Sequence, residues 1–220
     1  IFFIFMSEVI MKNLIIPLIY PSILGTVLTL FSFYASAHGY IRMPESRAYL
    51  CSFNDYLKEP KTPLNNDCGL GPEYEPQSIE TQKGFPESGP PDGLIASGGG
   101  IERFSPLDVQ TPTRWHKIDM KTGLNTFTWY LTMAHATDNW RFFITKNGWD
   151  QSAPLTRSAF ELTPFCQRDD HGAMPLIEVD INFICDVPAD HEGYHVILAT
   201  WDVDNTQNAF YQVIDVNLSN

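Results

Sequence analysis

The stretch "NTFTWYLT", residues 125–132, alternates polar with apolar side chains and indicates the fold class. Successive side chains of an extended strand point to opposite sides, so Phe127, Trp129 and Leu131 would share one face. Aromatic and β-branched residues are also the ones that favour strands. The stretch therefore predicts a β-strand whose apolar face packs into a core.

Three other segments have the same strand-like composition: "WRFFITK" (140–146), "HVILATWDV" (195–203) and "AFYQVIDVNL" (209–218). No segment beyond residue 38 shows a sustained helical period, and several short strands separated by turn residues are typical of a sandwich. We therefore expect an all-β protein with an immunoglobulin- or fibronectin III-like β-sandwich.

A long segment near the start of that sandwich has a different composition. From Cys51 to Pro106 the chain is rich in Pro, Gly, Asn and Ser, as in "GFPESGPPDG" (84–93). Such residues interrupt regular structure, and a loop of this length inside a domain is usually functional or disordered. We expect a long loop-rich lobe between the first two strands of a single domain.

Residues 1–37 resemble upstream residues followed by a secretory signal peptide. Lys12 gives a basic start, Leu14 to Tyr34 carries no charge, and Ala35-Ser36-Ala37 has the small residues that signal peptidase requires. An uncleaved membrane anchor is the alternative, because the uncharged run is long enough to span a bilayer. We expect cleavage after Ala37, secretion to the extracellular space, and a mature domain of residues 38–220 that is not attached to a membrane.

The charge balance limits the possible partners. The chain has 14 basic and 26 acidic residues, for a formal net charge of -12 at pH 7. An acidic surface repels nucleic acid and anionic membranes, so neither is an expected partner. A neutral polysaccharide is compatible with this charge, although the charge alone does not select one.

The four cysteines all lie in the expected mature part: Cys51, Cys68, Cys166 and Cys185. An even number of cysteines in an exported chain indicates two disulfides. Three pairings are possible, and we favour the pairing of near neighbours in the sequence, Cys51 with Cys68 and Cys166 with Cys185. A zinc site is the alternative, but the sequence contains no CxxC pair.

Cleavage after Ala37 would make His38 the first residue, which has a chemical consequence. The α-amine and the imidazole of one terminal histidine can chelate a single metal ion, and one more imidazole would complete an all-nitrogen, T-shaped set. Such planar nitrogen coordination suits Cu(II), which also has the highest affinity among the divalent first-row ions. Open positions on the copper could then take up an oxygen co-substrate for oxidative chemistry.

The second imidazole could come from any of five histidines: His116, His135, His171, His191 and His195. His195 lies in an apolar strand pattern and is interpreted as structural, and His171 and His191 lie in acidic, turn-like contexts typical of solvated loops. His116 has no obvious partner. His135 follows directly after a strong strand, where the fold can hold a side chain rigidly, but spacing alone does not single it out.

Six segments together resemble one known family: "HGYIRMPESRAYLC" (38–51), "YEPQSIE" (74–80), "TPTRWHKI" (111–118), "HATDNWRFFIT" (135–145), "WDQSAPLTRSAFELTPFC" (149–166) and "ATWDVDNTQNAFYQVIDVNL" (199–218). They are similar to the chitin-active lytic polysaccharide monooxygenases of auxiliary activity family 10, first described as chitin-binding proteins. The resemblance covers essentially all of residues 38–220.

The resemblance implies roles for particular residues. The amine and ring of His38 and the ring of His135 match the family's copper-binding histidine brace. Phe210 matches the aromatic residue on one axial side of the copper, and Glu80 matches a carboxylate next to the site that acts in catalysis. Tyr74 matches the exposed aromatic residue of the binding face.

Other positions match the same face or its surroundings, namely Glu75, Thr132 and Asn208. Without the resemblance, Phe210 would be interpreted as a core residue, Glu80 as a solvated charge and Tyr74 as an ordinary loop residue. Their expected roles in function therefore depend on the family.

The sequence departs from the family pattern in three places. Met133 stands where the family usually has a small alanine at the other axial side of the copper, so it could narrow access or shift the coordination. Asn205 replaces an acidic residue of the binding face. The insertion "YLKEPKTPLNND" (56–67) lengthens the segment between Cys51 and Cys68 and could reshape the edge of the face.

The resemblance implies a secreted, monomeric, copper-dependent enzyme that cleaves crystalline chitin oxidatively, with attack at C1. It would use an external electron donor and O₂ or H₂O₂ as co-substrate. Two alternatives remain: a non-catalytic adhesin for chitin or N-acetylglucosamine-bearing glycans, and a monooxygenase that acts on cellulose or a related β-1,4-linked polysaccharide.

Overall fold

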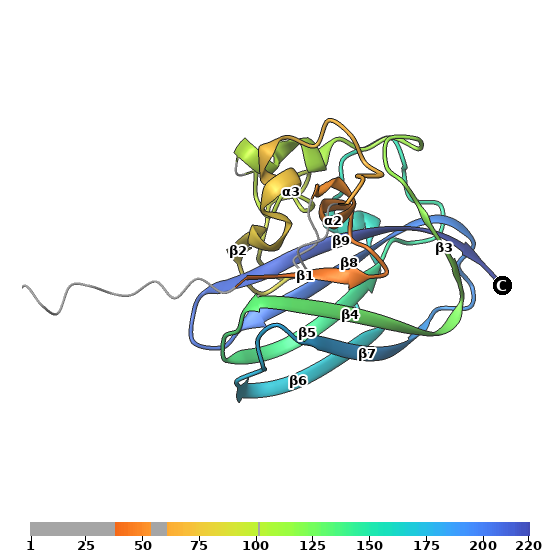
Figure 1. The fold of residues 1–220 in the computed structure, drawn as a ribbon. Helices are drawn as coiled ribbons and strands as arrows, with labels where there is room; N and C mark the ends of the chain where they lie inside the picture. The colour runs from red at the N-terminus through yellow and green to blue at the C-terminus, as the bar shows by residue number, and fades with distance from the viewer. Residues whose placement is uncertain (1–37, 54–60, 101) are drawn as a thin grey trace, which may run out of the picture. The chain divides into compact units, whose positions relative to one another are not determined.

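The structure, a computed structural model, describes residues 38–53, 61–100 and 102–220 (Figure 1). The predicted signal peptide and its cleavage site lie outside the described residues, so the start of the mature domain stays a prediction. No helix in the described part of the chain is long and apolar enough to cross a membrane.

The predicted β-sandwich is confirmed, with two sheets (Figure 1). The smaller sheet has the order β1-β4-β7, formed by β1 (His38–Met43), β4 (Gly123–Met133) and β7 (Asp180–Val187). The larger has the order β2-β9-β8-β5-β6, formed by β2 (Glu80–Gln82), β9 (Asn208–Ser219), β8 (Gly193–Val203), β5 (Thr137–Ile144) and β6 (Cys166–Ala173). β3 (Ile118–Lys121) pairs with β9 in parallel, and the other pairs are antiparallel.

The four predicted segments correspond to β4, β5, β8 and β9, whereas no residue range was predicted for β1, β2, β3, β6 or β7. β6 reads "CQRDDHGA" and lies at the edge of the larger sheet, where half-buried and exposed side chains alternate. Charged side chains are common on edge strands because they discourage pairing with another chain. They also remove the apolar pattern by which a strand is recognised.

The core between the sheets contains the apolar face of β4 that the sequence predicts. Phe127, Trp129 and Leu131 are all fully buried there. They pack with Trp140 of β5 and Trp201 of β8, whose rings stack at 5.1 Å between centroids and 9° between planes. Burial of these large rings is a dominant source of stability for the sandwich.

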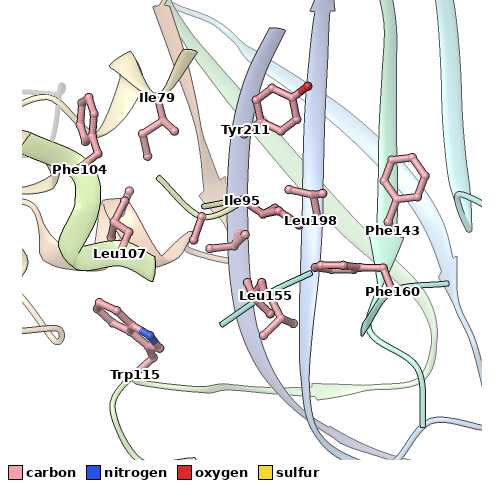
Figure 2. Close-up of a cluster of buried hydrophobic side chains, with 14 of the residues drawn as sticks. Ile79, Ile95, Phe104, Leu107, Trp115, Phe143, Leu155, Phe160, Leu198 and Tyr211 are labelled. Carbon is pink, nitrogen blue, oxygen red and sulfur yellow. The ribbon is translucent and has the colours of Figure 1, made fainter. Parts of the chain in front are cut away.

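In the structure the loop-rich lobe comprises the described residues between β1 and β3 other than β2, so it is longer at both ends than the sequence indicated. It covers the opposite face of the larger sheet and forms a second core (Figure 2). Ile79, Phe104, Leu107 and Trp115 of the lobe are buried in the same cluster as Phe143, Leu198 and Tyr211 of the sheet. The larger sheet is thus covered on both sides, which explains why β8 and β9 are almost continuously buried rather than alternating.

Short helices give the lobe its form: α2 (Arg47–Cys51), α3 (Leu70–Tyr74), and the 3₁₀ helices η2 (Pro76–Ser78) and η3 (Glu102–Asp108). A further 3₁₀ helix, η4 (Arg157–Ala159), lies between β5 and β6. These helices are too short to produce a helical period, which is why the sequence shows none. Ser46 caps α2 by accepting a hydrogen bond from the backbone N–H of Tyr49.

Both predicted disulfides are confirmed. Cys51–Cys68 closes the lobe between the end of α2 and the start of α3, and Cys166–Cys185 joins β6 to β7. Because β6 and β7 belong to different sheets, the second disulfide ties the two layers of the sandwich together.

The structure corrects the interpretation of His191 as part of a solvated loop. His191 is buried, its Nδ1 lies 2.8 Å from an oxygen of Asp190, and its ring lies 4.8 Å from that of His195. The turn before β8 folds back over His195 and removes His191 from water. His171 is exposed as expected, although it lies in β6 and not in a loop.

A buried ion pair joins the lobe to the sandwich. Arg47 at the start of α2 donates two hydrogen bonds to Asp215 of β9, at 2.8 Å and 2.6 Å, and neither side chain is exposed. Arg47 also donates to the carbonyl of Leu107 and to the side chain of Gln110. Burial and the charge of Asp215 raise the pKa of Tyr194, so its hydroxyl stays protonated and donates to Asp215 as well.

We expect Arg47→Met to lower the free energy of unfolding by about 3–5 kcal/mol, because Asp215 would remain buried without its cation. Urea denaturation with the disulfides intact would measure this loss. The double variant Arg47→Met/Asp215→Leu is the control, since it removes both charges and should recover much of the stability. A single variant within about 0.5 kcal/mol of the parent would show that the pair does not hold the lobe.

Candidate metal centre and binding face

The pairing of β1 with β4 brings the two candidate ligands to one end of the sandwich. His38, the first residue of β1, lies opposite Met133, the last residue of β4, and His135 follows two residues later. Close packing here requires Gly39, because a Cβ at that position would lie 2.6 Å from a methyl carbon of Leu131 and 3.2 Å from a ring carbon of Trp201. Strand register therefore places the histidines, which are far apart in the sequence.

His135 is held in one orientation by its neighbours. Its ring is buried, and its Nδ1 lies 3.2 Å from the amide oxygen of Asn205. An amide oxygen only accepts hydrogen bonds, so this contact is a hydrogen bond in the tautomer that carries its proton on Nδ1, and that tautomer leaves Nε2 available to a metal. Histidines that ligate metals usually donate their other ring N–H in this way.

The backbone of His135 is fixed as well. Its carbonyl oxygen accepts a hydrogen bond of 3.0 Å from the hydroxyl of Thr137, which itself accepts one of 2.8 Å from the indole N–H of Trp201. Trp201 is completely buried in the core. The backbone of His135 is thus held in place, through Thr137, by a tryptophan of the buried core.

The turn that carries Asn205 is anchored to the same region. The backbone N–H of Asp204 donates to the carbonyl of Ala136 at 2.8 Å, and Lys83 from the lobe donates to the carbonyl of Val203 at 2.8 Å. Nearby Asp202 pairs with Arg141 at 2.9 Å. Burial raises the pKa of the Asp202 carboxyl, and the positive charge of Arg141 opposes that rise.

Phe210 forms a wall beside His38. It is fully buried, its ring stacks on Trp201 with 4.9 Å between centroids, and its centroid lies 6.4 Å from that of the His38 ring. Phe210 is therefore both a core residue and a neighbour of the candidate ligand, so the two interpretations of this residue are compatible. Trp201 supports both histidines, His38 through Phe210 and His135 through Thr137.

Glu80 is placed next to this wall by β2. Its register partner in β9 is Phe210, and its carboxylate accepts a hydrogen bond of 2.9 Å from the side chain of Asn208. On the other side of the site, the hydroxyl of Thr132 lies 3.4 Å from the carbonyl oxygen of His38. The predicted site residues from β1, β2, β4 and β9 thus converge on one region.

The predicted binding-face residues Tyr74 and Glu75 lie at the end of α3. The side chain of Tyr74 is 58% exposed, as the resemblance implies, and Glu75 forms an ion pair of 3.0 Å with Arg103. Met133 is also exposed and lies directly opposite His38 in the ladder. The functional roles of these residues stay predictions.

Sequence reasoning missed three supporting residues. Asn205 was expected only on the binding face, whereas its amide oxygen also lies 3.2 Å from Nδ1 of His135. Thr137 and Trp201 had no expected role at the site, although both hold His135 in place. Two of these contacts join residues 70 and 64 positions apart, and the third reaches a carbonyl two residues away, so no local sequence motif indicates them.

The side chains present allow a test of metal binding. Among the described residues, no group of three or more His, Cys, Asp or Glu side chains is placed to hold a metal ion. The two imidazoles therefore need another nitrogen donor, and the main-chain nitrogen of His38 becomes one if the peptide bond before it is cut. Such an all-nitrogen set, completed by the imidazole of His135, fits copper.

Comparisons with known proteins agree with this geometry. Residues 38–216 match the family described as "Lytic polysaccharide mono-oxygenase, cellulose-degrading". A curated relative, GlcNAc-binding protein A of Shewanella oneidensis, is 51% identical over 191 residues, which are 87% of this chain and 38% of the relative. The chain thus spans about two-fifths of the length of such curated relatives.

Two solved structures extend the comparison. An AA10 lytic polysaccharide monooxygenase from Photorhabdus luminescens is 48% identical, with a TM-score of 0.76 over 83% of this chain and 99% of that one. A Bacillus amyloliquefaciens protein solved with Cu(I) is 42% identical, with a TM-score of 0.73 over 83% of this chain and all of that one. These matches show that the chain belongs to the AA10 family of lytic polysaccharide monooxygenases.

Proposed function

We propose that the chain is a secreted, copper-dependent monooxygenase that binds crystalline chitin and cleaves it oxidatively at C1. Signal peptidase would cut after Ala37, and the amine and ring of His38 with Nε2 of His135 would hold one copper ion. The observation that carries the proposal is the pairing of His38 with Met133, which places His38 at the same end of the sandwich as His135. Bound copper would supply one-electron redox chemistry with an external donor and O₂ or H₂O₂.

The other residues would position and protect this centre. Phe210 excludes water from one side of His38, and the contacts of Asn205 and Thr137 keep His135 from rotating. Glu80, steadied by Asn208, would orient the co-substrate or hold a proton on its carboxylate. A site fixed in this way needs little reorganisation before reaction.

The net reaction converts a C1–H bond of the polymer into C1–OH. One oxygen atom of the co-substrate enters the product and the other leaves as water, with two electrons and two protons required when O₂ is used. The glycosidic bond then breaks by elimination and leaves an aldonic acid end after hydration. No pair of hydrolytic carboxylates is required for this route.

Chitin is favoured as the substrate because the curated relatives are named for binding GlcNAc, the repeating unit of chitin. The description of the matching family names cellulose instead, so a cellulose-active enzyme is the second candidate. A chitin-binding adhesin without catalysis is the third, and it is favoured only by the names of those relatives. Tyr74, exposed at the end of α3, would serve all three.

Product analysis separates these candidates. The chain beginning at His38 would be incubated with chitin and, in parallel, with cellulose, in the presence of a reductant and copper. We expect oxidised chito-oligosaccharides by mass spectrometry, and none from a matched protein that retains Ala37, because its His38 nitrogen is an amide. Oxidised cello-oligosaccharides alone would select the second candidate, and binding of chitin without any oxidised product would select the adhesin.

We expect His135→Ala to abolish tight copper binding while the protein still unfolds cooperatively. Removal of one of two imidazoles leaves only the chelate of His38. Calorimetric copper titration of the chain beginning at His38 would measure the loss, with His116→Ala as the control. Retention of the parent affinity by His135→Ala would show that His135 is not a ligand.

We expect Met133→Ala to change the electron paramagnetic resonance spectrum of bound Cu(II) or the rate of turnover. Met133 is half exposed directly opposite His38, so its truncation opens space beside the proposed centre. Leu124→Ala, another exposed position on β4 at the strand's opposite end, is the control. An unchanged spectrum and rate in Met133→Ala would mean that methionine, in place of the alanine usual in the family, does not affect the copper centre.

A further inference from the structure

Two exposed aromatic rings meet on the surface of the lobe. Among the large hydrophobic side chains exposed in the described residues, Phe53 and Tyr74 are the only aromatic ones, at 44% and 58% exposure. Their ring centroids lie 5.9 Å apart, and the ring planes are inclined by 43°. Exposure of two adjacent rings to water is unfavourable, so their position favours a role in binding.

The backbone of Phe53 is held at both of its polar groups. Its N–H donates to the carbonyl of Glu73, one residue before Tyr74, at 3.3 Å, and its carbonyl accepts from the N–H of Lys61 at 2.9 Å. The disulfide of Cys51 lies two residues before it. Phe53 is therefore fixed against α3, and its ring is presented to solvent by a rigid support.

We propose that Phe53 is a second sugar-binding ring, which together with Tyr74 forms an aromatic corner for the polysaccharide. This inference rests on the proposed function and deepens it. The C–H bonds on the faces of a β-linked pyranose ring carry partial positive charge, which the negative face of an aromatic ring attracts. Phenylalanine has no hydroxyl, so its contact with the sugar is wholly apolar.

The inclination of the rings determines what each one contacts. Two rings set at 43° cannot both lie flat against one plane, so Tyr74 and Phe53 contact two different facets of the polymer.

Binding isotherms of the metal-free protein on chitin and on cellulose test the proposal without any turnover. We expect Phe53→Ala to weaken binding to the preferred polymer about two- to tenfold, the range of single aromatic contacts, and Phe53→Tyr to retain it. Leu162→Ala is the matched control, because Leu162 is also 44% exposed. It follows Glu161, whose backbone N–H donates a hydrogen bond to the carbonyl of Ile144, at the end of β5 that lies away from His135. Thermal unfolding would verify that the exposed substitutions leave the fold intact.

The double variant distinguishes direct contact from mere support of Tyr74. If Phe53 touches the sugar, Phe53→Ala should weaken binding further in a Tyr74→Ala background. No further loss in that background, or parent-like affinity of the single variant Phe53→Ala, would overturn the proposal. Failure of the parent protein to bind either polymer would instead overturn the proposed function itself.

Discussion

The buried ion pair between Arg47 and Asp215 holds the lobe in one position on the sandwich. Arg47 makes four hydrogen bonds, two to the carboxylate on β9 and two to Leu107 and Gln110 within the lobe. Its guanidinium also lies 4.5 Å from the ring of Trp115. Short helices that are not hydrogen-bonded to the strands could pack on an apolar sheet in several ways. A buried guanidinium, however, is stable only in the arrangement that brings its carboxylate within hydrogen-bonding distance. The pair therefore gives the lobe a unique orientation in addition to apolar burial.

That orientation matters because the candidate site is assembled from both parts. β1 and β9 of the sandwich supply His38 and Phe210, and His135 stands two residues after the end of β4. Glu80 comes from β2, the short edge strand that the lobe adds to the larger sheet. Trp201, buried in the core, contacts both sides of the site: its ring stacks on Phe210, and its indole N–H donates a hydrogen bond to Thr137. A rigid aromatic core can hold such side chains with little freedom, which is what a centre of few ligands requires.

The family assignment and the geometry support each other from independent directions. The matches to the AA10 family cover the sandwich and the lobe, while the contacts of His135 hold its ring and its carbonyl in one position near His38's end of the sandwich. The chain also has features of its own, in Met133 opposite His38 and in the aromatic corner of Phe53 and Tyr74. Both lie at positions where they could change the preference for a polymer without changing the class of reaction.

The sequence by itself indicated the sandwich, because the apolar face of "NTFTWYLT" must be buried. It favoured the two disulfides between cysteines close in the chain, and the structure decided among the three possible pairings. It also singled out His38, through the small residues before it, but only family resemblance joined His135 and Glu80 to that residue. The tertiary structure alone decided the support of the site by Asn205, Thr137 and Trp201, the burial of His191 and the pairing of Phe53 with Tyr74. The physical reason is that periodicity reports which face of a segment is apolar, whereas contacts between distant segments depend on register and on how the layers pack.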